Sequence, residues 1–421
     1  MVPSQSRASA PEARRRAARL GAKAFSPARR GRKLFGVDDA LGLTETQLMV
    51  RDAVREFART KIAPRARAAD EEGRFPRESF AEMAELSLTG IPVPEEYGGS
   101  GADTVSFILA LEELAKVCPS TALTLAAHTS LGTMPIVGAG SEAQKRRYVP
   151  PLATGKYAGA FCLTEANIGS DVAGAETFAE RKGDRYVIRG TKFYVTNATF
   201  AGSFVMSVVT DKTADKHRRL SAFVVEKGWR GIEVVKVEDK LGMRASETCV
   251  VQFDGVEAPA ENRLAPEGEG FEKVFMPTLN AGRIGISAIS IGIAEGAKEK
   301  ALAYAKERKQ FDRPLVDHQA IQFMFADMET EIHASRLMTL HAARLKDAGR
   351  DFAKAASMAK LFSAQMAMRA TRNAIQILGG YGYMQEYDVE RYYRDAKLCE
   401  IGEGTNEIQR IVIARHLLGR M

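Results

Sequence analysis

The chain contains 421 residues, of which 45% are hydrophobic and 27% are charged. This length and composition are typical of a soluble globular protein with two or three domains and a large core. The formal net charge is +7, but residues 1–36 alone carry +9 from ten basic residues and one acidic residue, so the remainder carries −2. A nearly neutral body argues against a nucleic-acid-binding face, because such a face needs a basic patch on the folded part.

Residues 1–40 form a basic segment that is rich in Arg, Ala and Ser and almost free of acidic residues. Organelle-targeting peptides and disordered basic leaders share this composition, and a start codon placed too far upstream would also produce it. The segment lacks a sustained apolar region, which argues against a secretory signal. We predict a disordered leader on a cytoplasmic protein. The alternative is a transit peptide and a location in the mitochondrial matrix.

The residue types that often bind metals are scattered along the chain. Cys118, Cys162, Cys249 and Cys399 are too far apart in sequence to suggest a zinc pair, and their scatter fits a reducing compartment. The longest uncharged run, residues 118–141, is long enough to cross a membrane, but its prolines, glycines and hydroxyl groups disfavour a membrane span. We expect no metal site, and we expect this run to be buried protein.

Residues 41–159 show helical periodicity. Thr44 and Gln47 form a predicted capping box at the start of one helix, whose apolar residues recur at helical spacing. Asp103 is expected to cap a second helix, and the Pro- and Gly-rich residues 92–101 mark a turn between the two. The pattern predicts an N-terminal all-α domain.

Residues 160–272 change to a period of two. Short stretches rich in β-branched and aromatic residues alternate here with Gly, Asp and Lys turns. This pattern predicts a middle domain built as a small antiparallel β-barrel or sandwich.

Residues 273–421 return to helical periodicity, with three long segments followed by a shorter one at residues 405–418. Such segments predict a C-terminal four-helix-bundle domain. The fold class is therefore α+β, with helices, then strands, then helices. No Gly-x-Gly-x-x-Gly joins a strand to a helix, so a Rossmann dinucleotide site is not expected.

Glu403 lies between Gly402 and Gly404, directly before the last predicted helix. Two glycines allow the backbone to bend tightly around the residue that they flank. The triplet alone fits an ordinary solvated turn, and it also fits a catalytic base held close to a ligand.

Three distant segments bear on this choice: residues 161–174, 376–395 and 399–410. They contain Thr-Glu-x-x-x-Gly-Ser-Asp, Gln-x-x-Gly-Gly-x-Gly and Glu-Gly-Thr. Together they closely resemble the signatures of the acyl-CoA dehydrogenase family, and the resemblance extends from about residue 42 to residue 421. It implies an FAD-dependent enzyme of the short/medium-chain type with the same order of three domains.

The resemblance implies that FAD binds without a covalent bond, between the middle domain and the C-terminal bundle. Contacts with this FAD are implied for Phe161, Leu163, Thr164, Gly169, Ser170, Tyr194, Val195 and Thr196. Contacts with the FAD of a neighbouring subunit are implied for Arg308, Phe311, Gln319, Gln376, Ile377, Leu378, Gly379 and Gly380. Thr405 and Asn406 are implied to lie at a helix start beside the cofactor, where backbone N–H groups favour an anion.

The family resemblance also implies which residues contact the acyl-CoA substrate, namely Ser170, Asn280, Arg283, Gly404 and Arg415. Glu403 is implied to be the base that removes the α-proton, while the flavin accepts the β-hydrogen as hydride. Entry of acyl-CoA should desolvate the carboxylate and raise its pKa towards the operating pH. Some relatives place the base at the position of Gly282, where this chain has no carboxylate.

The implied reaction is α,β-desaturation of an acyl-CoA to a trans-2-enoyl-CoA, in the catabolism of fatty acids or branched-chain amino acids. A homotetramer would pass the electrons to an electron-transfer flavoprotein. The sequence does not indicate the length or branching of the acyl chain.

Other members of the superfamily fit less well. Acyl-CoA oxidases share the scaffold but usually have much longer chains. Nitroalkane oxidases carry Asp at the base position and flavin monooxygenases lack the base, so Glu403 disfavours both. Decarboxylating glutaryl-type members carry an arginine in the stretch that matches residues 118–141, and this chain has none there. A non-catalytic assembly partner would be expected to lose the base or the FAD contacts, and this chain retains them.

Overall fold

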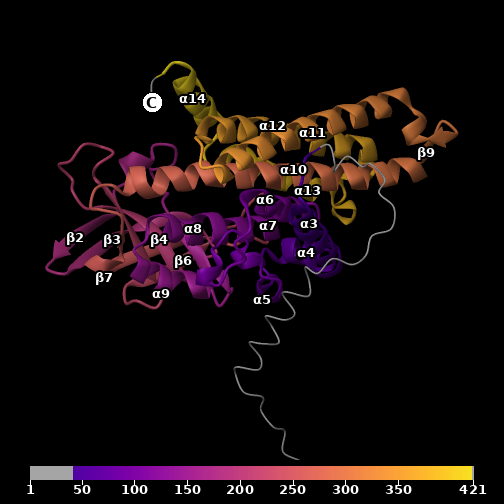
Figure 1. Ribbon diagram of the computed structural model, residues 1–421. Helices are drawn as coiled ribbons and strands as arrows, with labels where there is room; N and C mark the ends of the chain where they lie inside the picture. The colour runs from indigo at the N-terminus through magenta and orange to yellow at the C-terminus, as the bar shows by residue number, and fades with distance from the viewer. Residues whose placement is uncertain (1–40, 420–421) are drawn as a thin grey trace, which may run out of the picture.

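The computed structural model describes residues 41–419, so the predicted leader at residues 1–40 lies outside the described residues. Within them, the predicted order of helices, strands and helices is confirmed, and with it the α+β class. Figure 1 shows the N-terminal helices packed beside the sheet, with the C-terminal helices lying across both.

The N-terminal region is helical, and its helices begin where the sequence predicts caps. The helices are α3 (Glu45–Phe57), α4 (Ala63–Glu72), α5 (Arg77–Glu85), α6 (Thr104–Ala115), α7 (Pro119–Ala126), α8 (Met134–Ala139) and α9 (Glu142–Ala153). The capping box of Thr44 and Gln47 forms as predicted, and Asp103 accepts a hydrogen bond from the Ser106 N–H. Gln47 Nε2 also donates to Asp103 Oδ2 at 2.6 Å, so the two predicted caps hold α3 and α6 together.

The middle region is one eight-stranded sheet. Its strands are β1 (Ala158–Cys162), β2 (Phe178–Lys182), β3 (Arg185–Thr196), β4 (Ala201–Val209), β5 (Leu220–Glu226), β6 (Ile232–Val237), β7 (Thr248–Pro259) and β8 (Arg263–Leu264). The order is β6-β7-β3-β2-β4-β5-β8, with β1 paired to β4. Most pairs are antiparallel, as predicted, but β1 and β2 each pair with β4 in parallel. The sheet is therefore mixed, and alternation along single strands could not indicate these partners.

The C-terminal region contains α10 (Met276–Glu307), α11 (Gln319–Asp347), α12 (Ala353–Leu378), α13 (Val389–Ile401) and α14 (Asn406–Leu417). A short hairpin of β9 (Lys309–Gln310) and β10 (Arg313–Pro314) joins α10 to α11. The sequence pattern did not predict α13, because the residue at its start does not act as an ordinary helix cap. Asp388, at its N-cap, has a positive φ of 61° and makes no side-chain cap hydrogen bond.

Helix α10 is the central element of the molecule. It packs against α6 and α7 on one side and against α11 and α12 on the other, as Figure 1 shows, and it also packs against α13. Among the described residues, the stretch Phe271–Glu307 is long and apolar enough to cross a membrane by length and composition, but 72% of its apolar window is buried in the protein. Its apolar side chains therefore pack against protein, as in the central helix of a bundle.

Candidate active site

The loop that carries Glu403 joins α13 to α14 and has an unusual backbone. Glu403 and Gly404 both have positive φ, at 57° and 89°. This left-handed conformation is costly for a residue with a Cβ, by about 1–2 kcal/mol, and commonly occurs at functional sites. Gln409 on α14 stabilises it, because its buried Nε2 donates to the carbonyl oxygens of Glu403 at 3.3 Å and Gly404 at 2.8 Å. The loop is therefore a fixed structure and not an ordinary solvated turn.

The Glu403 side chain points at α10, where Gly282 makes room for it. A Cβ built at Gly282 would overlap Glu403 Oε2, and it would lie 2.8 Å from Cδ and 3.2 Å from Oε1. Real Cβ atoms essentially never approach other atoms that closely, so a side chain at residue 282 and the present position of the carboxylate exclude each other. The two positions at which relatives of the resembled family place their base thus meet in space, and this chain carries a carboxylate at only one of them.

The surroundings of Glu403 favour its protonated form more than water does. Burial raises the pKa of Glu403 from its ordinary value of 4.5 to about 7, while the positive charges of Arg283 and Lys360 oppose this shift. The residue as a whole is half-buried, and its carboxylate lies against α10 at Gly282. The sequence led us to expect a raised pKa on substrate entry. In the structure, burial by the protein's own atoms already raises the pKa.

Arg283 follows Gly282 on α10 and is buried. Its Nη1 donates to Asn280 Oδ1 at 2.6 Å and to Ser357 Oγ at 3.3 Å, while its Nε has no hydrogen-bond partner among the described residues. Two of the predicted substrate-binding residues, Asn280 and Arg283, therefore contact each other. Arg415, by contrast, is exposed on α14, and Ser170 is exposed on the loop after β1.

The two segments predicted to contact FAD in the middle domain lie side by side. The Phe193 N–H donates to the Thr164 carbonyl oxygen at 2.8 Å, which links the loop after β1 to β3. A buried ion pair between Lys192 Nζ and Glu165 Oε1, at 2.7 Å, supports the same junction from inside the sheet. Phe161, Leu163, Thr164, Val195 and Thr196 are thereby brought together on adjoining elements.

The backbone of β3 is distorted where this junction lies. Its register with β7 shifts between Lys192 and Val195, and Tyr194 and Asn197 both have positive φ. Bulges of this kind often re-aim a side chain beside an active site. Val195 is buried, whereas Tyr194 is 64% exposed although it is a large aromatic residue.

These features fit a bound flavin. An exposed tyrosine offers a face on which a planar ring can stack, and at Gly169 an added Cβ would meet no atom within 4 Å. The space beside Gly169 is thus open to a ligand such as a pyrophosphate. The residues present are therefore suited to hold FAD.

The residues predicted to contact the FAD of a neighbouring subunit lie at the opposite end of α10. Arg308 is the C-cap of α10, its guanidinium lies 5.8 Å from the centre of the Tyr381 ring, and Gln376, Gly379 and Gly380 are exposed nearby on the end of α12. Gly282 and Arg308 are 26 residues apart in sequence, which corresponds to about 39 Å along a helix. Figure 1 shows β9 and α14 at opposite ends of the bundle. These residues therefore cannot complete the Glu403 site of their own chain.

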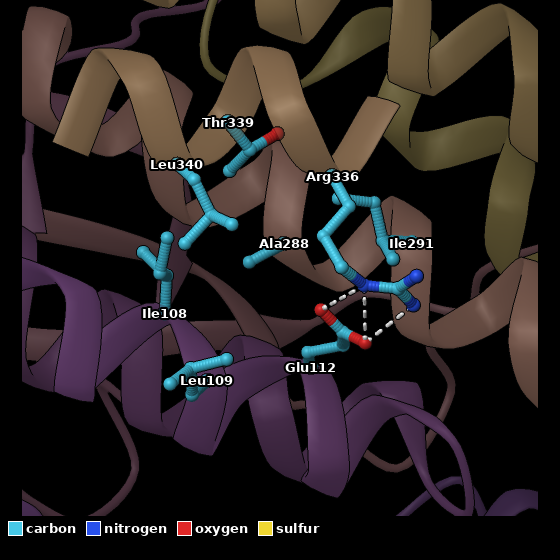
Figure 2. A pocket seen from close by; sticks show the side chains of 8 residues that line it. All are labelled: Ile108, Leu109, Glu112, Ala288, Ile291, Arg336, Thr339 and Leu340. Carbon is cyan, nitrogen blue, oxygen red and sulfur yellow. Dashed lines mark hydrogen bonds and ion pairs between the residues drawn. The ribbon is translucent and has the colours of Figure 1, made fainter. Parts of the chain in front are cut away.

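Other candidate sites in the described part of the chain are weak. Figure 2 shows a cavity between α6, α10 and α11, where Arg336 donates to Glu112 Oε1 at 2.8 Å. Its volume of about 10 Å³ is that of a single water molecule, and none of its lining residues belongs to the predicted site. Residues 41–419 contain no group of three or more His, Cys, Asp or Glu side chains that could hold a metal ion.

Sequence reasoning missed Lys360 and Gln409, which lie next to the Glu403 loop. Lys360 is fully buried on α12, 43 residues before Glu403. Gln409 lies on the inner face of α14 and looks like any polar helical residue in the sequence. Only the packing of α12 and α14 around the loop reveals either role, although a lysine among apolar residues of a helix was a signal that could have been noted.

Comparisons with known proteins agree with this geometry. Sequence profiles of the acyl-CoA dehydrogenase N-terminal, middle and C-terminal domains match residues 44–156, 160–256 and 268–418. A "probable acyl-CoA dehydrogenase" of Bacillus subtilis is 51% identical over 376 residues, which cover 89% of this chain and 99% of the relative.

Two solved structures are also closely similar. Butyryl-CoA dehydrogenase from Megasphaera elsdenii has a TM-score of 0.87 and 42% identity, over 89% of this chain and 99% of that chain. A chain in a study of the electron-transferring flavoprotein of Acidaminococcus fermentans has a TM-score of 0.88 and 45% identity, over 92% and 100% of the two chains.

The raised pKa of Glu403 predicts a pH-dependent change in stability when the carboxylate is removed. An unfolded chain ionises this group near its ordinary value of 4.5, whereas the folded chain keeps the proton up to about 7. The stability that the protonated group contributes is therefore present below pH 4.5 and lost as the pH rises through about 7. We predict that the melting temperature of Glu403→Gln, relative to the unchanged protein, rises between about pH 5 and pH 8.

The matched control is Glu407→Gln, in the first turn of α14 and four residues after Glu403. Glu407 is exposed, and the Glu407 backbone N–H with Thr405 and Arg410 lowers its pKa, so this variant should show no such gain. A pH-independent difference for Glu403→Gln would show that the Glu403 carboxyl is not held in its protonated form.

Proposed function

The chain belongs to the acyl-CoA dehydrogenase family, and we propose on this basis that it desaturates short-chain acyl-CoA thioesters at the α,β bond with Glu403 as the base. It is an oxidoreductase of the acyl-CoA dehydrogenase type. The assignment of Glu403 rests on the position of its carboxylate. The strained loop holds the carboxylate against Gly282, and burial raises its pKa to about 7.

The work of Glu403 is to remove a proton from the carbon next to the thioester carbonyl. A free carboxylate is a weak base, and a base is most effective when its pKa lies near the operating pH. Burial brings Glu403 into this range. The fixed loop holds the carboxylate at one place, so little orientational freedom is lost when the substrate binds.

FAD, when bound, supplies the acceptor for the hydride that leaves the β-carbon. Its ring would be held by Tyr194, Val195 and Thr196 of β3 and by Phe161, Leu163 and Thr164 after β1. The loop of Gly169 and Ser170 would face the pyrophosphate, because the space beside Gly169 is open. Thr405 and Asn406, at the start of α14, would add a helix N-terminus to the same site.

The substrate residues divide into two groups by their exposure. Ser170 and Arg415 are exposed and suited to contact the CoA moiety. Arg283 is buried and donates to Asn280, so we assign both residues to the wall of the site, where the Arg283 charge acts on Glu403. Gly404 lies beside the base, where its positive φ leaves the backbone close to the ligand. The preference for short acyl chains rests on the butyryl-CoA dehydrogenase structure, which this chain resembles over 89% of its length.

The electron acceptor that we propose is an electron-transferring flavoprotein, since a closely similar chain comes from a study of such a flavoprotein. We propose a cytoplasmic location, as expected for a chain similar to a protein of Bacillus subtilis. The burial of Phe271–Glu307 supports a protein that does not span a membrane.

We further propose that the protein is a homo-oligomer, a tetramer of two dimers. Phe311 is 89% exposed at the tip of the β9–β10 hairpin, where an apolar side chain gains nothing from contact with water. Arg308, Gln319 and Gln376 are exposed near it, about 39 Å along α10 from the Glu403 site. A neighbouring subunit that places its own FAD against this end would bury Phe311 and use the polar groups.

Replacing Glu403 by Gln should abolish rapid reduction of the flavin by substrate. Glutamine keeps the size of the side chain and can still form hydrogen bonds, but it cannot accept the α-proton. We predict normal flavin content and a rate of flavin bleaching by butyryl-CoA that is lower by about 10²–10⁴-fold. Stopped-flow absorbance under anaerobic conditions measures this rate directly.

Two comparisons make that experiment specific. Glu407→Gln removes an exposed carboxylate from the same helix start and should bleach at the rate of the unchanged protein. In the unchanged protein, butyryl-CoA should act faster than octanoyl-CoA. Bleaching of Glu403→Gln within about tenfold of the unchanged protein would rule out Glu403 as the base.

If subunits share their FAD sites, the purified protein should be yellow, and its flavin content should depend on the β9–β10 hairpin. We expect light scattering to give the mass of a tetramer, and we expect Phe311→Ala to lower the ratio of flavin to protein absorbance. The Phe311 side chain is 89% exposed, and its ring centre lies 6.1 Å from that of His318, so its loss should leave the fold intact. A monomer with full flavin content would contradict the shared site.

A further inference from the structure

Lys360 is a buried cation without a counter-ion in direct contact. It lies on α12 and is fully buried. In the described chain the only hydrogen-bond partner of its side chain is Asn406, whose Oδ1 accepts from Lys360 Nζ at 3.3 Å, and no carboxylate lies within ion-pair distance of this Nζ. Burial of a charge without a partner is strongly unfavourable. A lysine in such a position suggests a purpose other than stability.

The hydrogen bond of Lys360 joins α12 to the loop that carries Glu403. Asn406 is the first residue of α14 and directly follows the loop of residues 402–405. Its side-chain oxygen accepts from Lys360, and its Nδ2 donates to Glu400 Oε1 at 3.4 Å. The loop is therefore anchored at its C-terminal end between α12 and α13, while Gln409 holds its carbonyl groups.

The charged and titratable groups that act on Lys360 come from α10, from α13 and from the Glu403 loop. They are Arg283 on α10, Cys399 and Glu400 on α13, and Glu403 in the loop. Burial raises the pKa of the Cys399 thiol to about 11, so this group is neutral. Glu400 already pairs with Lys397 at 2.7 Å. Glu403 is thus the carboxylate without an ion pair that faces the Lys360 charge.

We propose that Lys360 is a positioning residue for the base: through Asn406 it fixes the Glu403 loop, and its buried charge keeps the Glu403 carboxylate in the anionic form that accepts a proton. The inference rests on the proposed role of Glu403. Burial of the carboxylate favours its protonated form, and a base that is already protonated cannot act. Two positive charges stabilise the anionic carboxylate and so oppose the effect of burial: Arg283 on α10 and Lys360 on α12.

The protonation state of Lys360 itself is compatible with this role. Burial lowers the pKa of Lys360 to about 8, so the ammonium form still predominates at neutral pH. Because the charge has no direct ion pair, its field is not neutralised locally and reaches the nearby carboxylate.

The decisive experiment compares Lys360→Gln with Lys360→Arg in the flavin-loaded enzyme without substrate. Glutamine can still donate to Asn406 but has no charge, whereas arginine keeps the charge. Infrared difference spectra against pH follow the carboxyl band that is absent in Glu403→Gln. We expect its midpoint to move upwards by on the order of one pH unit in Lys360→Gln and to stay close to the unchanged value in Lys360→Arg.

A kinetic measurement separates an electrostatic role from a structural one. Flavin bleaching by butyryl-CoA in Lys360→Gln should be slow at neutral pH and should recover as the pH is raised, because ionisation then restores the base. A purely structural defect would not recover. Lys346→Met is the matched control. Burial also lowers the pKa of Lys346, but this lysine donates to Thr104 Oγ1 at 2.9 Å and its charge is not one of those that act on Glu403, so both readouts should stay unchanged.

An unchanged carboxyl midpoint in Lys360→Gln would overturn the proposal, even if Glu403 is the base. If Lys360→Gln does not fold, Asn406→Asp replaces it, because this isosteric change pairs Lys360 with a carboxylate and offsets its charge. The Glu403 midpoint should then rise as well, and an unchanged midpoint would again overturn the proposal. Because the infrared titration needs no turnover, its outcome does not depend on the bleaching test of Glu403.

Discussion

The close contact between the Glu403 carboxylate and Gly282 is the constraint on which the rest of the site depends. A Cβ at residue 282 would overlap the carboxylate, so α10 must present a glycine at this point. The loop in turn must take a left-handed conformation to deliver the side chain there, and Gln409 must hold its carbonyl groups. This one close contact thus requires a glycine on α10, a left-handed backbone in the loop and a glutamine on the inner face of α14.

The charges around this contact work in opposite directions. Burial raises the pKa of Glu403 to about 7, and Arg283 and Lys360 limit the rise. Arg283 on α10 donates to Asn280 and Ser357, and Lys360 on α12 donates to Asn406. The two cations therefore lie on different helices. The base is therefore tuned by the bundle that places it. The β-domain contributes a separate part, the open face around Tyr194 that suits a flavin.

Much of this arrangement could be predicted from the sequence where the signal is local. The caps at Thr44 and Asp103 depend on near neighbours and form as predicted, and the order of helices, strands and helices follows the change of period in the sequence. The parallel pairing of β1 with β4 and the helix α13 were missed, since the first depends on strands 40 residues apart in sequence and the second begins at an Asp388 that makes no cap hydrogen bond. Lys360 and Gln409 were missed for the same reason, because their partners are set by tertiary packing.

The most direct test of the account is to fill the space at Gly282. Gly282→Ala adds one methyl group where the carboxylate now lies, whereas Gly285→Ala adds it one turn further along α10, at an ordinary 3.5 Å from Leu111 Cδ1. Both changes favour the helix by about 1 kcal/mol, so stability does not separate them. We expect both variants to bind flavin, and we expect Gly282→Ala alone to bleach about 10²-fold more slowly with butyryl-CoA. Equal rates in the two variants would contradict the placement of Glu403 as the base over Gly282.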